Sequence, residues 1–296
     1  MKKRIDVVGA QLDVGASKRG VSMGPLAIRF AGLCEGISDL GYDVNDKGDI
    51  IQLATGADRP GLRHYEQVID VGGKLYELVT GTLRTDGFPV VLGGDHSIAA
   101  GTIAATAKYY KSIGIIWMDA HGDWNNEEST LSGNMHGMPF SAVCGGGPVE
   151  MVDFGQDPVF VDPAKCVQIG GRDIDPAERI RLRESGVTVF SIDRIDRMGM
   201  EAVMDEAIRI AGTGTAGIHL SFDVDAITPE SAPGTGTIVH SGLTVREAFL
   251  GVEMLSASKK LIAVDMVEVN PILDEKNRTG ILASELVLAA LGKVVY

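Results

Sequence analysis

Apolar and polar positions alternate along the chain in short blocks with two distinct periods. Runs rich in apolar β-branched residues predict buried strands, whereas apolar residues spaced three and four apart predict amphipathic helices. The expected strands are 5–9, 88–92, 113–118, 166–169, 187–191, 218–222 and 261–267, with a weaker one near 42–44. The expected helices lie around 25–40, 65–83, 98–109, 177–184, 200–210, 245–255 and 280–291.

This alternation of strands and helices indicates the fold class. Strands separated by helices pair in parallel, and the crossover helices cover both faces of the sheet. The segments 145–148 and 213–217 are typical of loops within one domain, and no repeat or long linker divides the chain. We therefore expect a single α/β domain spanning 1–296 with a mainly parallel sheet.

Composition narrows the class of ligand. Hydrophobic residues make up 45% of the 296 positions but aromatic residues only 5%, which indicates an aliphatic core. The formal net charge is 27 − 40 = −13. This acid excess argues against a nucleic-acid partner and suits a cationic small-molecule substrate.

Cysteine usage and hydropathy indicate the compartment. Cys34, Cys144 and Cys166 are widely spaced, which argues against a disulfide framework and favours a reducing compartment. No apolar run is long enough to cross a bilayer. We expect a soluble cytoplasmic protein with no membrane partner.

Three polar motifs follow predicted strands: Gly-Gly-Asp-His-Ser at 93–97, Asp-Ala-His-Gly-Asp at 119–123 and Asp-Val-Asp at 223–225. Open α/β sheets bind ligands at the carboxyl ends of their strands. Alternate residues of an extended segment point to the same side, so the acidic and imidazole side chains within each motif are expected to converge. The converging set is His96, Asp119, His121, Asp123, Asp223 and Asp225.

Such a set has two interpretations. A single Asp-x-His at a strand end is usually a turn or a helix-capping device. Four carboxylates and two imidazoles can instead hold two divalent cations that polarise a water molecule. Burying these carboxylates, with Asp95, at apolar strand ends is costly without cations, so we favour a binuclear metallohydrolase.

Motifs in a fixed order also carry a family resemblance. They lie at 18–21, 24–25, 93–97, 119–125, 132–139, 171–176, 221–225, 233–237 and 267–271. On these motifs the chain resembles the ureohydrolase (arginase/agmatinase) family, most closely its bacterial-type arginases. The resemblance implies a three-layer αβα sandwich around a parallel sheet of about eight strands, two Mn²⁺ ions per subunit and a homo-oligomer, either a trimer or a hexamer.

The resemblance assigns the metal ligands residue by residue. One manganese would be held by His96, Asp119, Asp123 and Asp223. The other would be held by His121 and Asp225, with Asp119 and Asp223 bridging. Oxygen and imidazole donors suit Mn²⁺, although Zn²⁺, Co²⁺ and Ni²⁺ remain alternatives. Two dications balance four aspartates, so the site can accept a guanidinium.

The implied reaction is hydrolysis of the guanidinium of L-arginine to L-ornithine and urea, by attack of a metal-bridging hydroxide. Glu268 would pair with the guanidinium, Asp123 would carry the proton to the leaving amine, and His136 would exchange protons with solvent. The alternatives are that Glu268 is an ordinary strand-end acid and that His136 is a hydrogen-bonding loop histidine.

Substrate choice is expected to depend on the rim of the site. Residues matching those that recognise the α-carboxylate of arginine are Asn125, Thr130, Ser132 and Asn134. Those near the α-ammonium are Asp175 and Glu178, and Thr237 completes the substrate set. Neutral residues of this kind also occur simply as turn formers. Agmatine, guanidinobutyrate and formiminoglutamate remain alternative substrates, and a catalytically silent metal-binding subunit is a lower alternative.

The chain also departs from the family pattern at loop positions. Trp124, Asn126, Ala226, Thr228 and His240 replace residues that are more usual there. None of these departures removes a proposed metal ligand. We expect them to alter loop geometry and thereby the substrate range.

Overall fold

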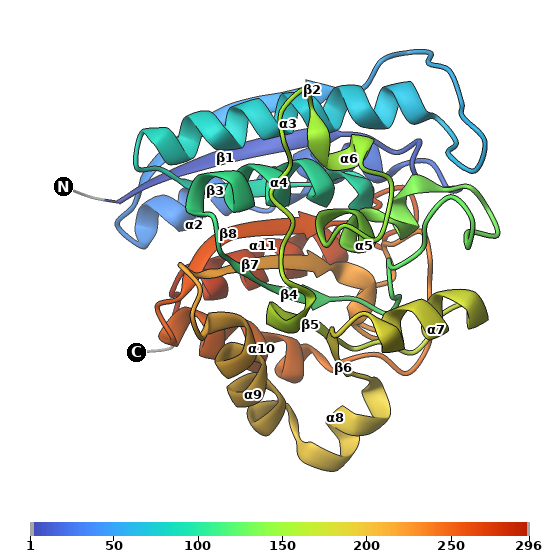
Figure 1. Ribbon diagram of the computed structural model, residues 1–296. Helices are drawn as coiled ribbons and strands as arrows, with labels where there is room; N and C mark the ends of the chain where they lie inside the picture. The colour runs from blue at the N-terminus through green and yellow to red at the C-terminus, as the bar shows by residue number, and fades with distance from the viewer. Residues whose placement is uncertain (1–2, 295–296) are drawn as a thin grey trace.

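The computed structural model describes residues 3–294, so the two positions at each end of the expected domain 1–296 lie outside the described residues. One eight-stranded sheet runs through the protein (Figure 1). Its strands are β1 (Arg4–Gln11), β2 (Asp43–Ile51), β3 (Phe88–Leu92), β4 (Gly114–Met118), β5 (Cys166–Ile169), β6 (Thr188–Phe190), β7 (Ile218–Asp223) and β8 (Leu261–Val267). Every neighbouring pair is parallel, in the order β2-β1-β3-β8-β7-β4-β5-β6.

All eight expected strands are present, but β2 is much longer than the weak strand expected near 42–44. It carries the polar sequence DVNDKGDII and lies at the edge of the sheet. An edge strand has only one neighbouring strand and more contact with water, so it needs no continuous apolar run. The apolar pattern therefore underestimates its length.

The helices are α1 (Gly24–Phe30), α2 (Leu33–Asp39), α3 (Tyr65–Arg84), α4 (Ala99–Tyr110), α5 (Pro139–Val143), α6 (Glu150–Asp153), α7 (Pro176–Glu184), α8 (Ile192–Met198), α9 (Met200–Gly212), α10 (Val245–Ala257) and α11 (Arg278–Ala290). The single helix expected over 25–40 is wrong, because the backbone breaks at Gly32, whose φ is 86°. Helices α5, α6 and α8 were not predicted from the sequence, because they are too short to show a helical period.

The helices cover both faces of the sheet and create two apolar cores. One core joins the sheet to α3, α4, α5 and α6, and the other joins it to α1, α2, α9, α10 and α11. Figure 1 shows α3 and α4 on the near face and α11 behind the strands. The expected three-layer αβα sandwich with a parallel sheet is confirmed.

The strand order decides where the polar motifs meet. Strands β3, β8, β7 and β4 are consecutive in the sheet, so their carboxyl ends form one continuous edge. The turn after β3 passes so close to β1 that a side chain at Gly94 would overlap the carbonyl of Leu12. Within residues 3–294, no helix combines the length and the apolar character needed to cross a membrane.

Candidate metal centre

Each of the four central strands delivers at least one functional side chain at or just beyond its carboxyl end. His96 begins a 3₁₀ turn after β3, and Asp119 directly follows β4. Asp223 is the last residue of β7, and Glu268 directly follows β8. These four side chains are almost completely buried. The sheet therefore brings together residues that are up to 172 positions apart in the chain.

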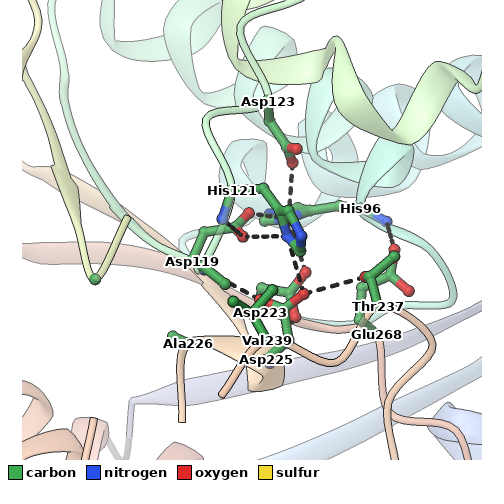
Figure 2. A network of polar contacts seen from close by, with 12 residues as sticks. His96, Asp119, His121, Asp123, Asp223, Asp225, Ala226, Thr237, Val239 and Glu268 are labelled. Atoms are coloured by element: carbon green, nitrogen blue, oxygen red, sulfur yellow. Dashed lines mark hydrogen bonds and ion pairs between the residues drawn. The ribbon is translucent and has the colours of Figure 1, made fainter. Parts of the chain in front are cut away.

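The six expected ligands converge on two points that share Asp119. His96 Nδ1 lies 3.1 Å from an oxygen of Asp119, 3.1 Å from one of Asp123 and 3.3 Å from one of Asp223. His121 Nδ1 lies 3.3 Å from the other oxygen of Asp119 and 3.1 Å from Asp225. Figure 2 shows these side chains pointing toward one another.

Strand alternation alone does not bring the ligands together, so that part of the sequence prediction is wrong. Asp119, His121 and Asp123 lie on an irregular turn beyond β4. Asp123 adopts a φ of 47°, and Asp225 lies in a 3₁₀ turn after β7. Asp95 stays outside the cluster, because its carboxylate accepts hydrogen bonds from Gly15 N and Ser97 N.

The crowding of buried carboxylates makes this region strongly electronegative. Burial, together with the neighbouring Asp225 and Asp119 carboxylates, raises the pKa of Asp223 well above its ordinary value. Burial and the Asp119 charge likewise raise the pKa of Asp123 to about 6. Like charges in a low-dielectric site cannot all ionise without compensation, so the arrangement favours bound cations.

The donor set fits a pair of divalent cations. His96 Nδ1 is buried and makes no well-aligned hydrogen bond, although three carboxylate oxygens surround it. Two groups have ligand atoms close enough to share an ion, namely His96 with Asp119 and Asp223, and Asp119 with His121 and Asp225. Carboxylate and imidazole donors suit first-row divalent metals, including Mn²⁺.

A second layer of side chains, which was not predicted from the sequence, holds the proposed ligands in place. Trp117 stacks on His96 with ring centroids 4.0 Å apart, and its indole N–H donates to Asp119 Oδ2 at 3.0 Å. Gln168 Nε2 donates to the carbonyls of Asp119 and His121. The sequence position of Trp117 could have identified it as a neighbour of the cluster, because it lies two residues before Asp119 and points to the same side of the strand.

Glu268 and His136 form a contacting pair beside the cluster. Glu268 Oε1 accepts from the backbone N–H of His96 at 2.9 Å and lies 3.1 Å from His136 Nδ1. Glu268 has a φ of 64°, and such strain in a non-glycine residue is typical of functional sites. Burial lowers the pKa of His136, but the Glu268 carboxylate outweighs it and raises the pKa to about 9.

A cleft with a volume of about 140 Å³ opens directly above the cluster. All seven residues expected to bind substrate line the cleft, together with three of the expected metal ligands and His136. The lining residues are His121, Asp123, Asn125, Thr130, Ser132, Asn134, His136, Gly137, Asp173, Asp175, Glu178, Asp223 and Thr237.

The rim residues of the cleft also make hydrogen bonds within turns, as the alternative interpretation of them as turn formers predicts. Thr130 Oγ1 accepts from Gly133 N, and Ser132 Oγ accepts from Asn134 N. Asn125 Oδ1 accepts from Ser129 Oγ at 2.9 Å. A hydroxyl that accepts one bond still has its proton to donate, so turn formation and ligand recognition are compatible here.

The acidic side of the rim is held by the start of α7. Asp175 is the residue before this helix, and its N–H donates to Glu178 Oε2 at 3.2 Å. Glu178 Oε1 accepts from Trp124 N at 2.8 Å. Both Glu178 oxygens therefore contact backbone, whereas Asp175 is the more accessible acid. Thr237 Oγ1 donates to Asp225 Oδ2 at 3.2 Å, so it contacts a proposed metal ligand.

Comparison with known proteins identifies the family. A family model described as the Arginase family matches residues 3–292. The chain is 44% identical over 294 residues to the arginase of Bacillus subtilis (strain 168), with 99% of each chain covered.

The chain belongs to the Arginase family. It is also 42% identical to the arginase of Bacillus caldovelox, covering 98% of this chain and 99% of the relative. The crystal structure of arginase from Bacillus cereus matches all of both chains with a TM-score of 0.94 and 45% identity. The resemblance to bacterial-type arginases is confirmed, and the chain is an Arginase-family hydrolase.

The structure shows what surrounds the residues that depart from the family pattern. Trp124 is buried edge-to-face against Phe140, and Asn126 Oδ1 accepts two backbone bonds of the following turn. Ala226 is fully buried, and its carbonyl accepts from Arg172.

The remaining two departures contact one acid on the loop after β7. Thr228 Oγ1 donates to Glu230, and His240 Nδ1 lies 3.4 Å from the same side chain. All five departures lie beside the cluster or in the loops around it, rather than among its six proposed ligands.

Two further residues at the site were not predicted from the sequence. Asp173 lines the cleft, and Lys18 lines an adjoining cavity with Glu268. Lys18 lies in the motif at 18–21, and Asp173 lies in the motif at 171–176. Their positions in those motifs were the signal, but neither motif indicates which of its side chains faces the cleft.

Proposed function

We propose that this protein hydrolyses the guanidinium of L-arginine to L-ornithine and urea. One observation carries the proposal, namely a single cleft in which a cluster of six imidazole and carboxylate side chains, able to hold metal ions, lies below a polar, acid-containing rim. The membership in the Arginase family and the 44% identity to a Bacillus arginase support it. The chain's net charge of −13 favours approach of a cationic substrate.

We infer that two Mn²⁺ ions are the native cofactor. The first would be held by His96, Asp119, Asp123 and Asp223, and the second by His121, Asp225, Asp119 and Asp223. When bound, such a pair lowers the pKa of water and supplies a nucleophile near neutral pH. Asp119 contacts both histidines, which supports a bridging role.

Glu268 and His136 would position the guanidinium and handle protons. Glu268 Oε1 is engaged by His96 N and His136 Nδ1, which fixes the carboxylate beside the cluster. Its charge complements a guanidinium, and such pairing orients the planar group. His136, with a pKa of about 9, carries a proton at neutral pH and is partly exposed, so it can exchange that proton with solvent.

Asp123 would accept the proton released by the nucleophile and pass it to the leaving amine. Its carboxylate lies within the cluster, 3.1 Å from His96 Nδ1, and lines the cleft, so it is placed to carry a proton between the cluster and a bound substrate. Its strained backbone, with a φ of 47°, turns the side chain toward His96.

The rim would select an α-amino acid. Asn125, Thr130, Ser132 and Asn134 supply hydroxyl and amide groups for a carboxylate. Asp175 supplies an accessible negative charge for the α-ammonium, with Glu178 behind it. Agmatine has no α-carboxylate, so the neutral side of the rim would be left without a partner for it.

The test is urea release by Mn²⁺-loaded protein, with L-arginine, agmatine and guanidinobutyrate compared at equal concentration. Formamide release from formiminoglutamate is measured in parallel. We expect urea mainly from arginine. Preference for another guanidine would overturn the assigned substrate but leave the hydrolase mechanism, whereas inactivity with two bound metals would favour the silent-subunit alternative.

We further infer a homo-oligomer, either a trimer or a hexamer. Three exposed apolar side chains, Met23, Leu26 and Phe30, recur at helical spacing on and just before α1, and Phe30 is 86% exposed. Large exposed apolar side chains in a row are typical of interaction surfaces. Light scattering after size-exclusion chromatography measures the mass, and a monomer would contradict this inference.

A further inference from the structure

Two cysteines lie in contact at the end of α5, although the sequence places them 22 residues apart. Cys144 Sγ is 3.7 Å from Cys166 Sγ. Cys144 directly follows α5, is partly buried and precedes the exposed Gly145. Cys166 is the first residue of β5 and is completely buried. The pair therefore joins a solvent-facing turn to the central sheet.

We propose that Cys144 and Cys166 are a reversible disulfide site that a hydroperoxide oxidises in the folded protein. A disulfide has an S–S bond of about 2.05 Å, so the sulfurs have to approach by roughly 1.7 Å. Three consecutive glycines, 145–147, follow Cys144 and can absorb this movement. Gly145 already has a φ of 81°.

The two sulfurs have different roles because their exposure differs. Cys144 is the accessible thiol, so its thiolate attacks the peroxide. Burial raises the pKa of Cys166 well above its ordinary value, and this thiol therefore stays protonated until a sulfenic acid forms beside it. Cys166 Sγ donates to the carbonyl of Asp162 at 3.5 Å, which fixes its position.

The chemistry balances in two steps. The Cys144 thiolate attacks one oxygen of the hydroperoxide, the O–O bond breaks, and the other oxygen leaves as an alkoxide or hydroxide that takes a proton. Cys144 is then a sulfenic acid. The Cys166 sulfur attacks this sulfenic sulfur, the S–O bond breaks, and water leaves with the thiol proton. A dithiol reductant reverses the oxidation by thiol–disulfide exchange.

The pair is mechanically connected to the metal centre through α5. Ser141 lies on this helix, and its hydroxyl donates to the carbonyl of Asn125 at 2.5 Å. The N–H of Ser141 donates to the carbonyl of Asp123 at 3.2 Å, so it holds the backbone of a proposed metal ligand. Closing the disulfide moves the end of α5 and thereby disturbs Asp123. We therefore expect the oxidised protein to release its metal faster.

The test uses the full chain carrying Cys34→Ser, which removes the third cysteine at a position on α2. The folded protein is treated with hydrogen peroxide, and its thiols are counted before and after. We expect both remaining thiols to disappear, the mass to fall by two hydrogens, and a digest to contain one peptide pair linked through residues 144 and 166. Dithiothreitol should restore both thiols.

Two matched variants, Cys144→Ser and Cys166→Ser in the same background, should give no intramolecular cross-link. Persistence of both thiols in the parent protein would overturn the proposal, as would a mass gain from sulfinic acid without a cross-link. Release of Mn²⁺ to a chelator is the second readout. An unchanged release rate in the cross-linked protein would refute the connection to Asp123, independently of which substrate the enzyme uses.

Discussion

His96 Nε2 lies 2.9 Å from the hydroxyl oxygen of Ser221, and both side chains are completely buried. Ser221 is on β7, two residues before the proposed ligand Asp223. With a metal ion on Nδ1, which faces the carboxylates, the ring proton would lie on Nε2 and be donated to Ser221. This hydrogen bond would then fix both the tautomer and the orientation of the proposed metal-binding imidazole.

Replacing Ser221 with alanine should therefore weaken metal binding without removing a ligand. We expect the affinity for Mn²⁺ to fall by roughly 10- to 100-fold, the usual effect of losing such a partner. Competition with a chelator measures this affinity. Ser221→Cys, of similar size, is the packing control and should lose less, whereas equal affinity in Ser221→Ala and the parent protein would show that the bond is dispensable.

Asp119 is the acid common to both ligand groups. Asp119→Asn keeps the size of the side chain but removes the shared charge, so both cations should bind more weakly. We expect a loss of about 4 kcal/mol of transition-state stabilisation, or roughly a thousandfold in rate. Metal content and urea release are measured together. Asp205→Asn, on the exposed side of α9, is the charge control, and a fully metallated, active Asp119→Asn protein would contradict the bridging role.

Asp175 should decide between arginine and guanidinobutyrate, because guanidinobutyrate carries no ammonium group. Asp175→Ala removes a charge-assisted hydrogen bond to the α-ammonium of arginine, worth about 2 kcal/mol or roughly 30-fold in kcat/KM. Guanidinobutyrate use should change much less. Because Asp175 precedes α7, Asp175→Asn is the control that retains a helix-capping side chain. Equal losses for both substrates would remove the specificity argument.

Asp6 should contribute to stability at neutral pH. This buried carboxylate of β1 accepts hydrogen bonds from Thr82 at 2.8 Å and from Arg4 at 2.6 Å. Burial opposes ionisation, but the hydrogen bonds from Thr82, Arg4 and Asn45 outweigh it and lower the pKa of Asp6. The ionised form therefore stabilises the fold above the ordinary carboxyl range, and this contribution is lost as the pH falls through the lowered pKa.

Asp6→Asn should accordingly lower the free energy of unfolding near neutral pH by about 2 kcal/mol. Its stability should also fall less steeply than that of the parent protein between about pH 6 and pH 3. Urea denaturation over this range measures both effects. Asp39→Asn, exposed at the end of α2, is the control. Parallel stability profiles for Asp6→Asn and the parent protein would contradict the prediction.

The fold was predictable where burial imposes a pattern. Strands such as β4 and β7 are buried on both faces, so their apolar runs mark them clearly. The edge strand β2 and the break at Gly32 were not predicted correctly, because water contact relaxes the pattern and a single left-handed residue leaves the helical period intact. Local sequence determines such features weakly.

The sequence predicted which residues form the candidate site, but it did not predict how they are arranged in space. The motifs named all six cluster residues, and the cleft contains every predicted substrate contact. The stacking of Trp117 on His96 and the hydrogen bond between His96 and Ser221 depend on packing between strands, so no local motif predicts them. These supporting contacts decide how rigidly the ligands are held.

The sequence by itself determined which side chains stand at the strand ends, because apolar runs must be buried and the acids must follow them. Only the tertiary structure decided that β8 and β7 lie between β3 and β4, which places His96, Asp119, Asp223 and Glu268 on one edge. It also decided that Cys144 touches Cys166. Strand order results from the packing of helices on both faces of the sheet, and that long-range competition leaves no local signature in the chain.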